Sequence, residues 1–310
     1  FEDIRKCLAC NQGCIERLMF EPGSSIRCAI NPETGQELIY PQGPAEKSRK
    51  VWIVGAGPAG LVAAYESARL GHKVTLFEKT ANTGGQIKFA SQAPVKQLYG
   101  DWISWLAKQV EKMGVEIKTD TEVTETMLNE GNMDVVILAI GGENIVPEVK
   151  GLDQPMVCDA TGILSGDVQP GKNVLIIGGG LIGMETADFL AERGSDVTIV
   201  EMQGQSPVMK FAAHGYQLHK RLRTAECGYF FNTQVESVQE NSVTLNNNGK
   251  NEILSPIDQV VLAVGMKPRQ DLKKFLLENN ISHYIVGDAS KVRRIIEATG
   301  DGAKAAWDIQ

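Results

Sequence analysis

The chain has 310 residues, of which 43% are hydrophobic and 22% charged, and its formal net charge is −7. This length accommodates two or three domains with cores of their own, and we expect a soluble protein because no apolar run approaches the roughly 18 residues of a membrane-spanning helix. Nucleic acids and anionic membranes are disfavoured as partners, since both require a basic face that this acidic chain does not offer.

Four of the six cysteines lie near the start, in the polar stretch CLACNQGCIERLMFEPGSSIRC. Cys7, Cys10, Cys14 and Cys28 have the spacing C-x2-C-x3-C-x13-C. A disulfide framework distributes its cysteines to join distant elements, so this cluster indicates a reducing, cytoplasmic location and predicts a metal site in segment 1–45. The spacing alone favours an iron–sulfur cluster and leaves zinc open, because four thiolates suit both.

The clearest pattern is an internal repeat. Residues 51–79, VWIVGAGPAGLVAAYESARLGHKVTLFEK, align without a gap on residues 174–202, VLIIGGGLIGMETADFLAERGSDVTIVEM. Each copy predicts a buried strand, a glycine-rich turn, an amphipathic helix and a second strand that ends in a carboxylate, Glu78 or Glu201. The chain therefore contains the βαβ unit twice.

The three glycines of G-x-G-x-x-G have separate tasks in a dinucleotide-binding turn. The first makes the tight turn, the second lets the backbone approach a pyrophosphate, and the third lets the helix lie close to the strand. The acid that follows accepts hydrogen bonds from the adenosine ribose, whereas glycines that served packing alone would not need it twice. The candidates are Gly55, Gly57, Pro58, Ala59, Gly60, Glu78 and Lys79 in the first copy, and Gly178, Gly180, Leu181, Ile182, Gly183 and Glu201 in the second.

Between and after the two copies, further segments predict regular structure. Residues 94–114 are amphipathic, and we expect a helix that anchors Trp102 and Trp105 on a sheet rather than a docking patch. Residues 135–142 and 259–268 are nearly continuous apolar strands closed by glycine, as in a parallel sheet covered on both faces.

The last predicted elements are a short strand and a helix within residues 285–309. Between them stand Gly287 and Asp288, which taken alone could be a simple turn. Cys158 and Cys227 have no thiol or histidine partner nearby in the sequence, and we expect both to behave as small apolar residues.

This order of elements resembles the flavoproteins with two dinucleotide-binding domains, the glutathione-reductase-like fold. The resemblance implies an α/β protein with two Rossmann-like domains, the second inserted in the first: an FAD-binding domain over 46–145 and 267–310, and an NAD(P)H-binding domain over 146–266. It places Gly287 and Asp288 in the FAD site and makes Glu185, in GGGLIGMETA, the catalytic acid near the nicotinamide. The redox C-x-x-C of the disulfide reductases does not follow the first βαβ unit.

The cysteine motif, followed by GAGPAG and TGGQ, is similar to the C-terminal half of the 2,4-dienoyl-CoA reductase, 2-enoate reductase and trimethylamine dehydrogenase family. Members of this family carry an N-terminal TIM barrel with FMN, then a 4Fe–4S cluster and two dinucleotide domains. The resemblance covers essentially the whole chain without the barrel. It implies a 4Fe–4S cluster on the four cysteines and adds Gly85 and Gln86 of TGGQ to the flavin site.

The resemblance implies a route for electrons from NAD(P)H through FAD to the cluster, and in the intact enzyme on to barrel FMN, which reduces an enoyl or dienoyl C=C bond. NADH is favoured over NADPH because Glu201 holds a free ribose diol and repels a 2′-phosphate, although Lys210 could reverse this preference. The alternatives are a stand-alone electron-transfer module for a separate acceptor protein, and an amine-dehydrogenase-like module with a structural ADP site. Since the sequence starts at Phe1, we expect a trimmed product or a fragment. A homo-oligomer is a further possible partner arrangement.

Overall fold

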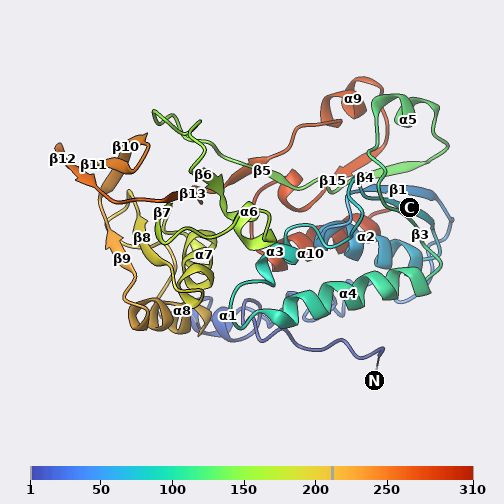
Figure 1. Ribbon diagram of the computed structural model, residues 1–310. Helices are drawn as coiled ribbons and strands as arrows, with labels where there is room; N and C mark the ends of the chain where they lie inside the picture. Colours follow the sequence, from blue (N-terminus) through green and yellow to red (C-terminus); the bar gives the residue numbers. More distant parts are fainter. Residues whose placement is uncertain (1, 211–212, 310) are drawn as a thin grey trace. The chain divides into compact units, whose positions relative to one another are not determined.

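The computed structural model describes residues 2–210 and 213–309 (Figure 1). The chain divides into two compact units, each with its own five-stranded sheet. The first unit takes in residues 1–88, 98–143 and 267–310, and the second takes in residues 89–97 and 144–266. The cysteine segment is thus part of the first unit, and the first unit is interrupted twice by the second.

The sheet of the first unit is parallel throughout, with the strand order β15-β4-β1-β2-β3. Its strands are short, and the three central ones are mostly buried because both faces are covered, whereas the two edge strands are half-buried or exposed. They are β1 (Lys50–Val54), β2 (Lys73–Phe77), β3 (Glu116–Lys118), β4 (Val135–Leu138) and β15 (His283–Ile285).

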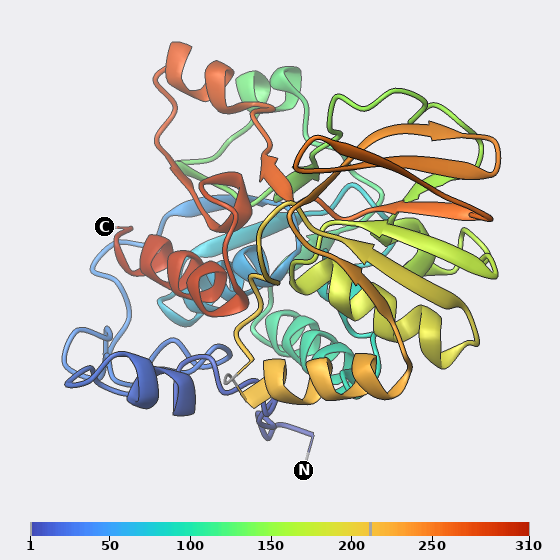
Figure 2. The same ribbon diagram turned by 90° about the vertical axis from the view of Figure 1, so that its left-hand side faces the viewer.

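Helices α2 (Pro58–Arg69) and α10 (Ile295–Trp307) pack against each other in the first unit, and Figure 2 shows them side by side in blue and red. The predicted amphipathic helix is α4 (Gln97–Lys112), which buries Trp102 in the core, so the expectation of an anchored helix is confirmed. The smaller elements are α1 (Ile15–Phe20), α3 (Ile87–Ala90), α5 (Glu125–Glu130), α9 (Lys273–Glu278), η1 (Gly287–Ala289) and the paired strands β5 (Gly142–Asn144) and β14 (Met266–Pro268).

The sheet of the second unit is also parallel, with the order β6-β13-β7-β8-β9. Its elements are β6 (Val157–Asp159), α6 (Ala160–Ser165), β7 (Asn173–Ile177), α7 (Leu181–Glu192), β8 (Asp196–Val200), α8 (Ala213–Thr224), β9 (Gly228–Phe230) and β13 (Gln259–Leu262). Between β9 and β13 the chain adds an antiparallel sheet of β10 (Thr233–Gln239), β11 (Ser242–Asn247) and β12 (Lys250–Leu254).

The two halves of the sequence repeat become the same substructure in the two units. β1, α2 and β2 of the first unit correspond to β7, α7 and β8 of the second, and both helices have 12 residues. The strand pairs also share one register, because Val51 lies opposite Val74 as Val174 lies opposite Val197. The predicted α/β class with two Rossmann-like domains is therefore confirmed.

The two apolar segments predicted as strands, residues 135–142 and 259–268, form shorter strands than predicted. β4 ends at Leu138 and β13 at Leu262, and each is followed by loop backbone that contacts the glycine turn of its own unit.

Among the helices that the structure describes, none is both long and apolar enough to cross a bilayer.

Candidate cofactor sites

The glycine turn of the first unit joins β1 to α2, and two of its glycines are required by the backbone itself. Gly55 has a φ of +103°, and a Cβ there would overlap the carbonyl oxygen of Ala139 after β4. A Cβ on Gly60 would overlap the carbonyl oxygen of Gly55. Gly57 is different, because the nearest atom to a Cβ there is the Cα of Gly85 at 3.9 Å. Gly55 and Gly60 are therefore packed against backbone, whereas the space beside Gly57 is open.

The turn of the second unit repeats this arrangement between β7 and α7. Gly178 has a φ of +111°, and a Cβ there would overlap the carbonyl oxygen of Ala263. A Cβ on Gly183 would overlap the carbonyl oxygen of Gly178, whereas nothing lies within 4 Å of one on Gly180. Gly57 and Gly180 are the N-caps of their helices and make no side-chain cap hydrogen bond, so the first-turn amides, apart from Pro58, which has no N–H, lack a capping partner. Such an end is suited to a phosphate group.

The acids at the ends of the second strands are both buried, and both hold the glycine turn. Oε2 of Glu78 accepts a hydrogen bond from the backbone N–H of Ala56 at 2.9 Å. Oε2 of Glu201 accepts one from the N–H of Gly179 at 2.8 Å. These acids were predicted to bind ribose, and the structure gives each a second task that the sequence motif did not reveal.

The other oxygen of each acid differs between the units. Oε1 of Glu78 accepts from both the N–H and the hydroxyl of Thr80, at 2.9 and 2.8 Å. Oε1 of Glu201 accepts from the N–H of Gln203 at 2.8 Å and, within the part of the chain that the structure describes, from no second donor. A carboxylate offers about four acceptor positions, so Glu201 keeps more capacity for a ligand hydroxyl than Glu78 does.

The TGGQ loop lies against the first turn, as its place in the predicted flavin site requires. The N–H of Gly84 donates to the carbonyl oxygen of Ala56 at 2.7 Å, and a Cβ on Gly85 would stand 3.0 Å from the Cα of Gly57. Gln86, the residue after Gly85, is exposed. Lys79, two residues after the end of β2, is exposed as well. The first unit thus brings residues from two separate motifs to one turn.

Gly287 and Asp288 form the short helix η1, which packs on the first turn of α2. A Cβ on Gly287 would lie 2.8 Å from the Cβ of Ala59. The N–H of Gly287 donates to Asp301 at 3.2 Å, and Asp288 accepts from the N–H of Arg293 at 3.1 Å. Burial raises the pKa of the Asp288 carboxyl above its usual range. This pair is therefore part of the first glycine-turn region and not an isolated surface turn.

In the second unit, Glu185 of α7 is buried and pairs with Lys96, whose Nζ donates to Oε1. In the aligned position of the first repeat stands Val62, which is buried in an apolar core. The fold therefore accepts an apolar residue at this position, and a charged one there is not required by helix packing. The family resemblance pointed to Glu185, but the sequence carries no signal for Lys96, because no motif links positions 89 residues apart.

The four clustered cysteines lie in the first unit as free thiols, with Cys7 exposed and the other three half-buried. The N–H of Ala9 donates to Sγ of Cys7 at 3.3 Å, and the N–H of Gln12 donates to the thiol of Cys10. Positive φ angles of 55° at Ala9 and 57° at Asn11 shape the loop that aims these amides. Backbone N–H groups directed at sulfur are a usual environment of metal-bound thiolates.

The other three thiols of the segment contribute to the pKa of Cys10. The pKa of Cys10 is raised, first by burial and then by the negative charges that Cys28, Cys14 and Cys7 would carry. In residues 2–210 and 213–309, no three histidine, cysteine or acidic side chains converge on a point that could hold one metal ion. A cluster binds its thiolates at separate metal corners, so the donor chemistry of this segment fits such a group.

The other two cysteines stand apart from this segment. Both belong to the second unit, and burial raises the pKa of Cys158 and of Cys227 to about 11. Both pack against the apolar core of that unit, so they are present as small apolar side chains.

Two sheets of one topology, each with a glycine turn and a buried acid, define a protein with two dinucleotide-binding domains of the glutathione-reductase type. The sequence profile of the pyridine nucleotide-disulphide oxidoreductases matches residues 49–295. The chain belongs to this family.

Individual relatives are longer than this chain. It is 36% identical to an NADH oxidase of Thermoanaerobacter brockii, over 99% of the chain and 48% of that protein. It is 32% identical to a cinnamate reductase of Clostridium sporogenes, over 100% of the chain and 46% of that protein. A solved 2-naphthoyl-CoA reductase complex is similar with a TM-score of 0.92 and 31% identity, over 100% of this chain and 47% of that one. The chain thus spans about half the length of the relatives it matches, and the predicted resemblance to one half of longer reductases is confirmed.

Proposed function

We propose that this chain is the electron-input half of an NAD(P)H-dependent flavoprotein reductase. The observation that carries the proposal is the duplicated turn, in which Gly57 and Gly180 leave space beside free helix amides while neighbouring glycines are tightly packed. A protein with two such turns is built to hold two dinucleotides. In this proposal FAD binds the first unit, NAD(P)H binds the second, and a 4Fe–4S cluster binds Cys7, Cys10, Cys14 and Cys28.

In the first unit, the proposed roles follow from the contacts. The amides of the first turn of α2 would bind the pyrophosphate of FAD, and Gly57 would let the backbone approach it. The TGGQ loop and Asp288 lie against the same turn and would contact the rest of the flavin nucleotide. Glu78 would keep the turn in place through Ala56 and offer its remaining acceptor position to ribose.

In the second unit, Glu201 supports a preference for NADH. It is buried, its carboxylate accepts two backbone hydrogen bonds, and about two acceptor positions remain for a ribose diol. A 2′-phosphate would place a second negative charge beside it. Lys210, the cation that could offset this repulsion, is exposed.

Bound at these sites, nicotinamide, flavin and cluster would supply hydride transfer and single-electron transfer. The protein would position them and exclude water. Glu185 remains the proposed acid near the nicotinamide, and Lys96 would fix the direction in which its carboxylate points. In the first unit, amides aimed at Cys7 and Cys10 would stabilise the thiolate form that a cluster requires.

We further propose that the acceptor is an FMN-containing barrel and that the intact enzyme reduces an enoyl or dienoyl C=C bond. Helix α1, beside the cysteines, leaves Ile15, Leu18, Met19 and Phe20 between 44% and 58% exposed. Such a group of large apolar side chains favours a protein partner. The names of the similar cinnamate and 2-naphthoyl-CoA reductases agree with this substrate class. The cytoplasm is its proposed location because the cysteines are clustered.

Anaerobic titration tests the proposal. The chain is loaded with FAD, reconstituted with iron and sulfide, and titrated with NADH or NADPH while its visible absorption is recorded. We expect NADH to bleach the flavin band at lower concentration than NADPH does, and the cluster absorption to decrease with it. Retention of zinc in place of iron would contradict the cluster. Retained FAD that neither nucleotide bleaches would favour a structural ADP site in the second unit.

A further inference from the structure

Helix α10 contacts the cysteine segment through a buried hydrogen bond. The hydroxyl of Thr299 lies 2.8 Å from the carbonyl oxygen of Ala29, the residue after Cys28, and 3.0 Å from the carbonyl oxygen of Ile295 in its own helix. Thr299 has no solvent exposure and Ala29 has 1%. Without this hydroxyl, the carbonyl of Ala29 would lose a donor in a place that water does not reach.

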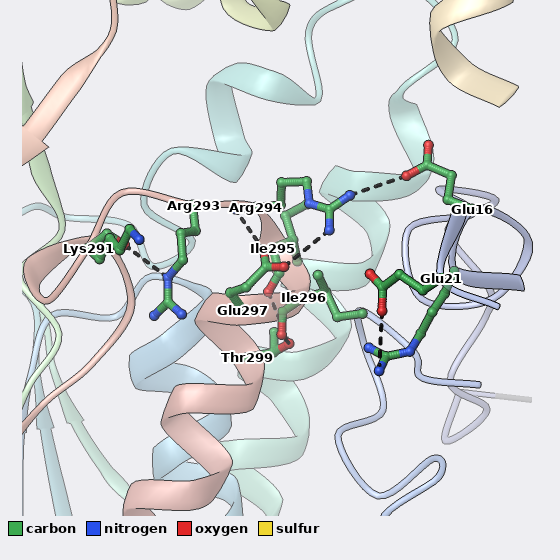
Figure 3. Close-up of polar contacts among 10 residues, drawn as sticks. Glu16, Glu21, Lys291, Arg293, Arg294, Ile295, Ile296, Glu297 and Thr299 are labelled. Atoms are coloured by element: carbon green, nitrogen blue, oxygen red, sulfur yellow. Dashed lines mark hydrogen bonds and ion pairs between the residues drawn. The ribbon is translucent and has the colours of Figure 1, made fainter. Parts of the chain in front are cut away.

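A second contact is ionic and lies at the start of the same helix. Arg294 is the N-cap of α10, and its guanidinium lies between two carboxylates, Glu16 of α1 and Glu297 of α10, at 3.2 Å from each (Figure 3). Glu16 is buried and stands two residues after Cys14. The arginine therefore links α10 to the helix that follows the third cysteine.

The third contact lies between the second and third cysteines. A Cβ on Gly13 would overlap the carbonyl oxygen of Arg27 at 2.4 Å and stand 2.6 Å from Cδ1 of Ile296, so glycine is required here by the Arg27 backbone and the loop also touches α10. The carbonyl of Gly13 also accepts from the N–H of Arg27 at 2.7 Å, which joins the backbone before Cys14 to the backbone before Cys28. Three positions of the segment thus rest on the first two turns of one helix.

The same helix packs closely on the first glycine turn. A Cβ on Gly302 would overlap the carbonyl oxygen of Ala59, and a Cβ on Gly287, in η1 ahead of α10, would lie 2.8 Å from the Cβ of the same residue. Ala59 belongs to the first turn of α2, directly after Gly57 and Pro58. Helix α10 therefore stands in direct contact with both the proposed cluster segment and the proposed flavin turn.

We propose that α10 is the spacer that sets the cysteine segment against the first glycine turn, with Thr299 and Arg294 as its positioning residues. Thr299 holds the backbone beside Cys28, and Arg294 holds the helix beside Cys14. The inference deepens the proposed function, because the distance between two redox groups matters only if both bind here. The contacts themselves exist in the chain without either group.

The test compares four variants of the full chain. Thr299→Val removes the hydroxyl at nearly constant shape, Thr299→Ser retains it, and Arg294→Met removes the charge at the other contact. Lys304→Met is the matched control, since it breaks the ion pair with Asp308 at the far end of α10, away from the cysteines. The readouts are hydrogen exchange of peptides covering residues 7–30 in the metal-free chain, and release of iron to a chelator after reconstitution.

We expect Thr299→Val to speed both exchange in residues 7–30 and iron release about tenfold, and Arg294→Met to speed them about threefold. Thr299→Ser and Lys304→Met should behave as wild type. Wild-type rates in both Thr299→Val and Arg294→Met would overturn the inference, as would equal acceleration in the Lys304→Met control. If Thr299→Val does not fold, Arg294→Met against Lys304→Met decides. A wild-type chain that takes up no iron would contradict the proposed cluster, while the exchange data would still decide the spacer role.

Discussion

The two glycine turns are nearly identical in backbone and differ in what surrounds them. Gly55 and Gly178 share the same overlap with a carbonyl of the neighbouring strand's loop, and Glu78 and Glu201 hold equivalent turn amides. The first turn is then contacted by the TGGQ loop, by η1 and by α10. The second unit instead has a largely buried ion pair between Glu185 of α7 and Lys96.

This comparison separates what the fold requires from what a particular ligand requires. Features present in both units, such as the packed glycines and the acid bonded to the turn, support the shared βαβ geometry and do not distinguish the two turns. Features present in one unit only, such as Glu185 where the other has Val62, are the ones that assign different ligands to the two turns. The following experiments begin with the largest expected effect and end with the smallest.

Because both units need a glycine at the first position of the turn, replacing it should lower the stability of the two units by similar amounts. Gly55→Ala and Gly178→Ala each place a Cβ on a backbone carbonyl at positive φ, and each should destabilise its unit by about 3 kcal/mol, or about 10 °C. The controls Gly114→Ala and Gly249→Ala have positive φ and open space, and should cost about 1 kcal/mol. Thermal denaturation followed by circular dichroism measures both. A glycine-turn variant that melts like its control would show that the overlap is relieved cheaply.

The cysteine segment belongs to the first unit only, so its loss should leave the second unit intact. Cys10→Ser should reduce the iron bound after reconstitution at least about fivefold, because a hydroxyl is a poor substitute for a thiolate ligand. Cys158→Ser, at a half-buried cysteine of the second unit, should retain wild-type iron content. Iron and sulfide analysis gives the result, and equal iron in both variants would contradict the proposed cluster ligands.

Removing one partner of the ion pair between Glu185 and Lys96 should destabilise the second unit. Lys96→Met leaves the Glu185 carboxylate largely buried without its cation, and we expect a loss of about 2 kcal/mol in the stability of the second unit. The double variant Lys96→Met/Glu185→Gln should recover most of this loss. Lys172→Met, which breaks the exposed pair with Asp196, should change stability by less than about 0.5 kcal/mol. Urea denaturation measures all three, and a Lys96→Met variant as stable as the Lys172→Met control would contradict the pairing.

The open glycines should discriminate between the two ligands. Gly57→Ala should weaken FAD binding about tenfold and leave NADH binding unchanged, and Gly180→Ala should do the reverse, because a Cβ occupies space that only a ligand uses. Each variant is the matched control of the other, and each also bears a small N-cap penalty of about 1 kcal/mol. Calorimetric titration of both ligands into both variants tests this. Equal weakening of both ligands by one variant would contradict the assignment.

The smallest expected effect is a pH dependence of the first unit. The pKa of Asp288 is raised by burial, so the ionised carboxylate is less favourable in the folded than in the unfolded chain. The contribution of Asp288 to the free energy of unfolding is therefore full below the unfolded pKa near 3.8. It is lost as the pH rises through the raised pKa of the folded chain.

Asp288→Asn cannot ionise and keeps Oδ1 for the N–H of Arg293. The variant should melt about 1–2 °C above the wild type at pH 7 and equal it near pH 3.5. Melting curves of the metal-free, flavin-free chain across this range are the measurement. A difference that grows toward low pH would have the wrong sign for this explanation.

Much of the fold could be predicted because the same pattern of strand, glycine turn, helix and acid occurs twice in the sequence. The alternation of strand, glycine turn, helix and acid depends on local rules, and the structure reproduces it in both units. The contacts of Lys96, Thr299 and Arg294 could not be predicted in this way. Each joins residues 89 to 278 positions apart, and ordinary residue types in unremarkable contexts carry no signal of such partners.

By itself, the sequence determined two dinucleotide-type βαβ units, their order in the chain and the four thiols that precede them, because glycine spacing and cysteine clustering act through local geometry and donor chemistry. Only the tertiary structure decided that the buried acids hold the turns, that the TGGQ loop and Gly287 reach the first of them, and that α10 lies against the cysteine segment. The physical reason is that packing brings together groups distant along the chain, and which buried polar atoms become partners depends on the completed fold.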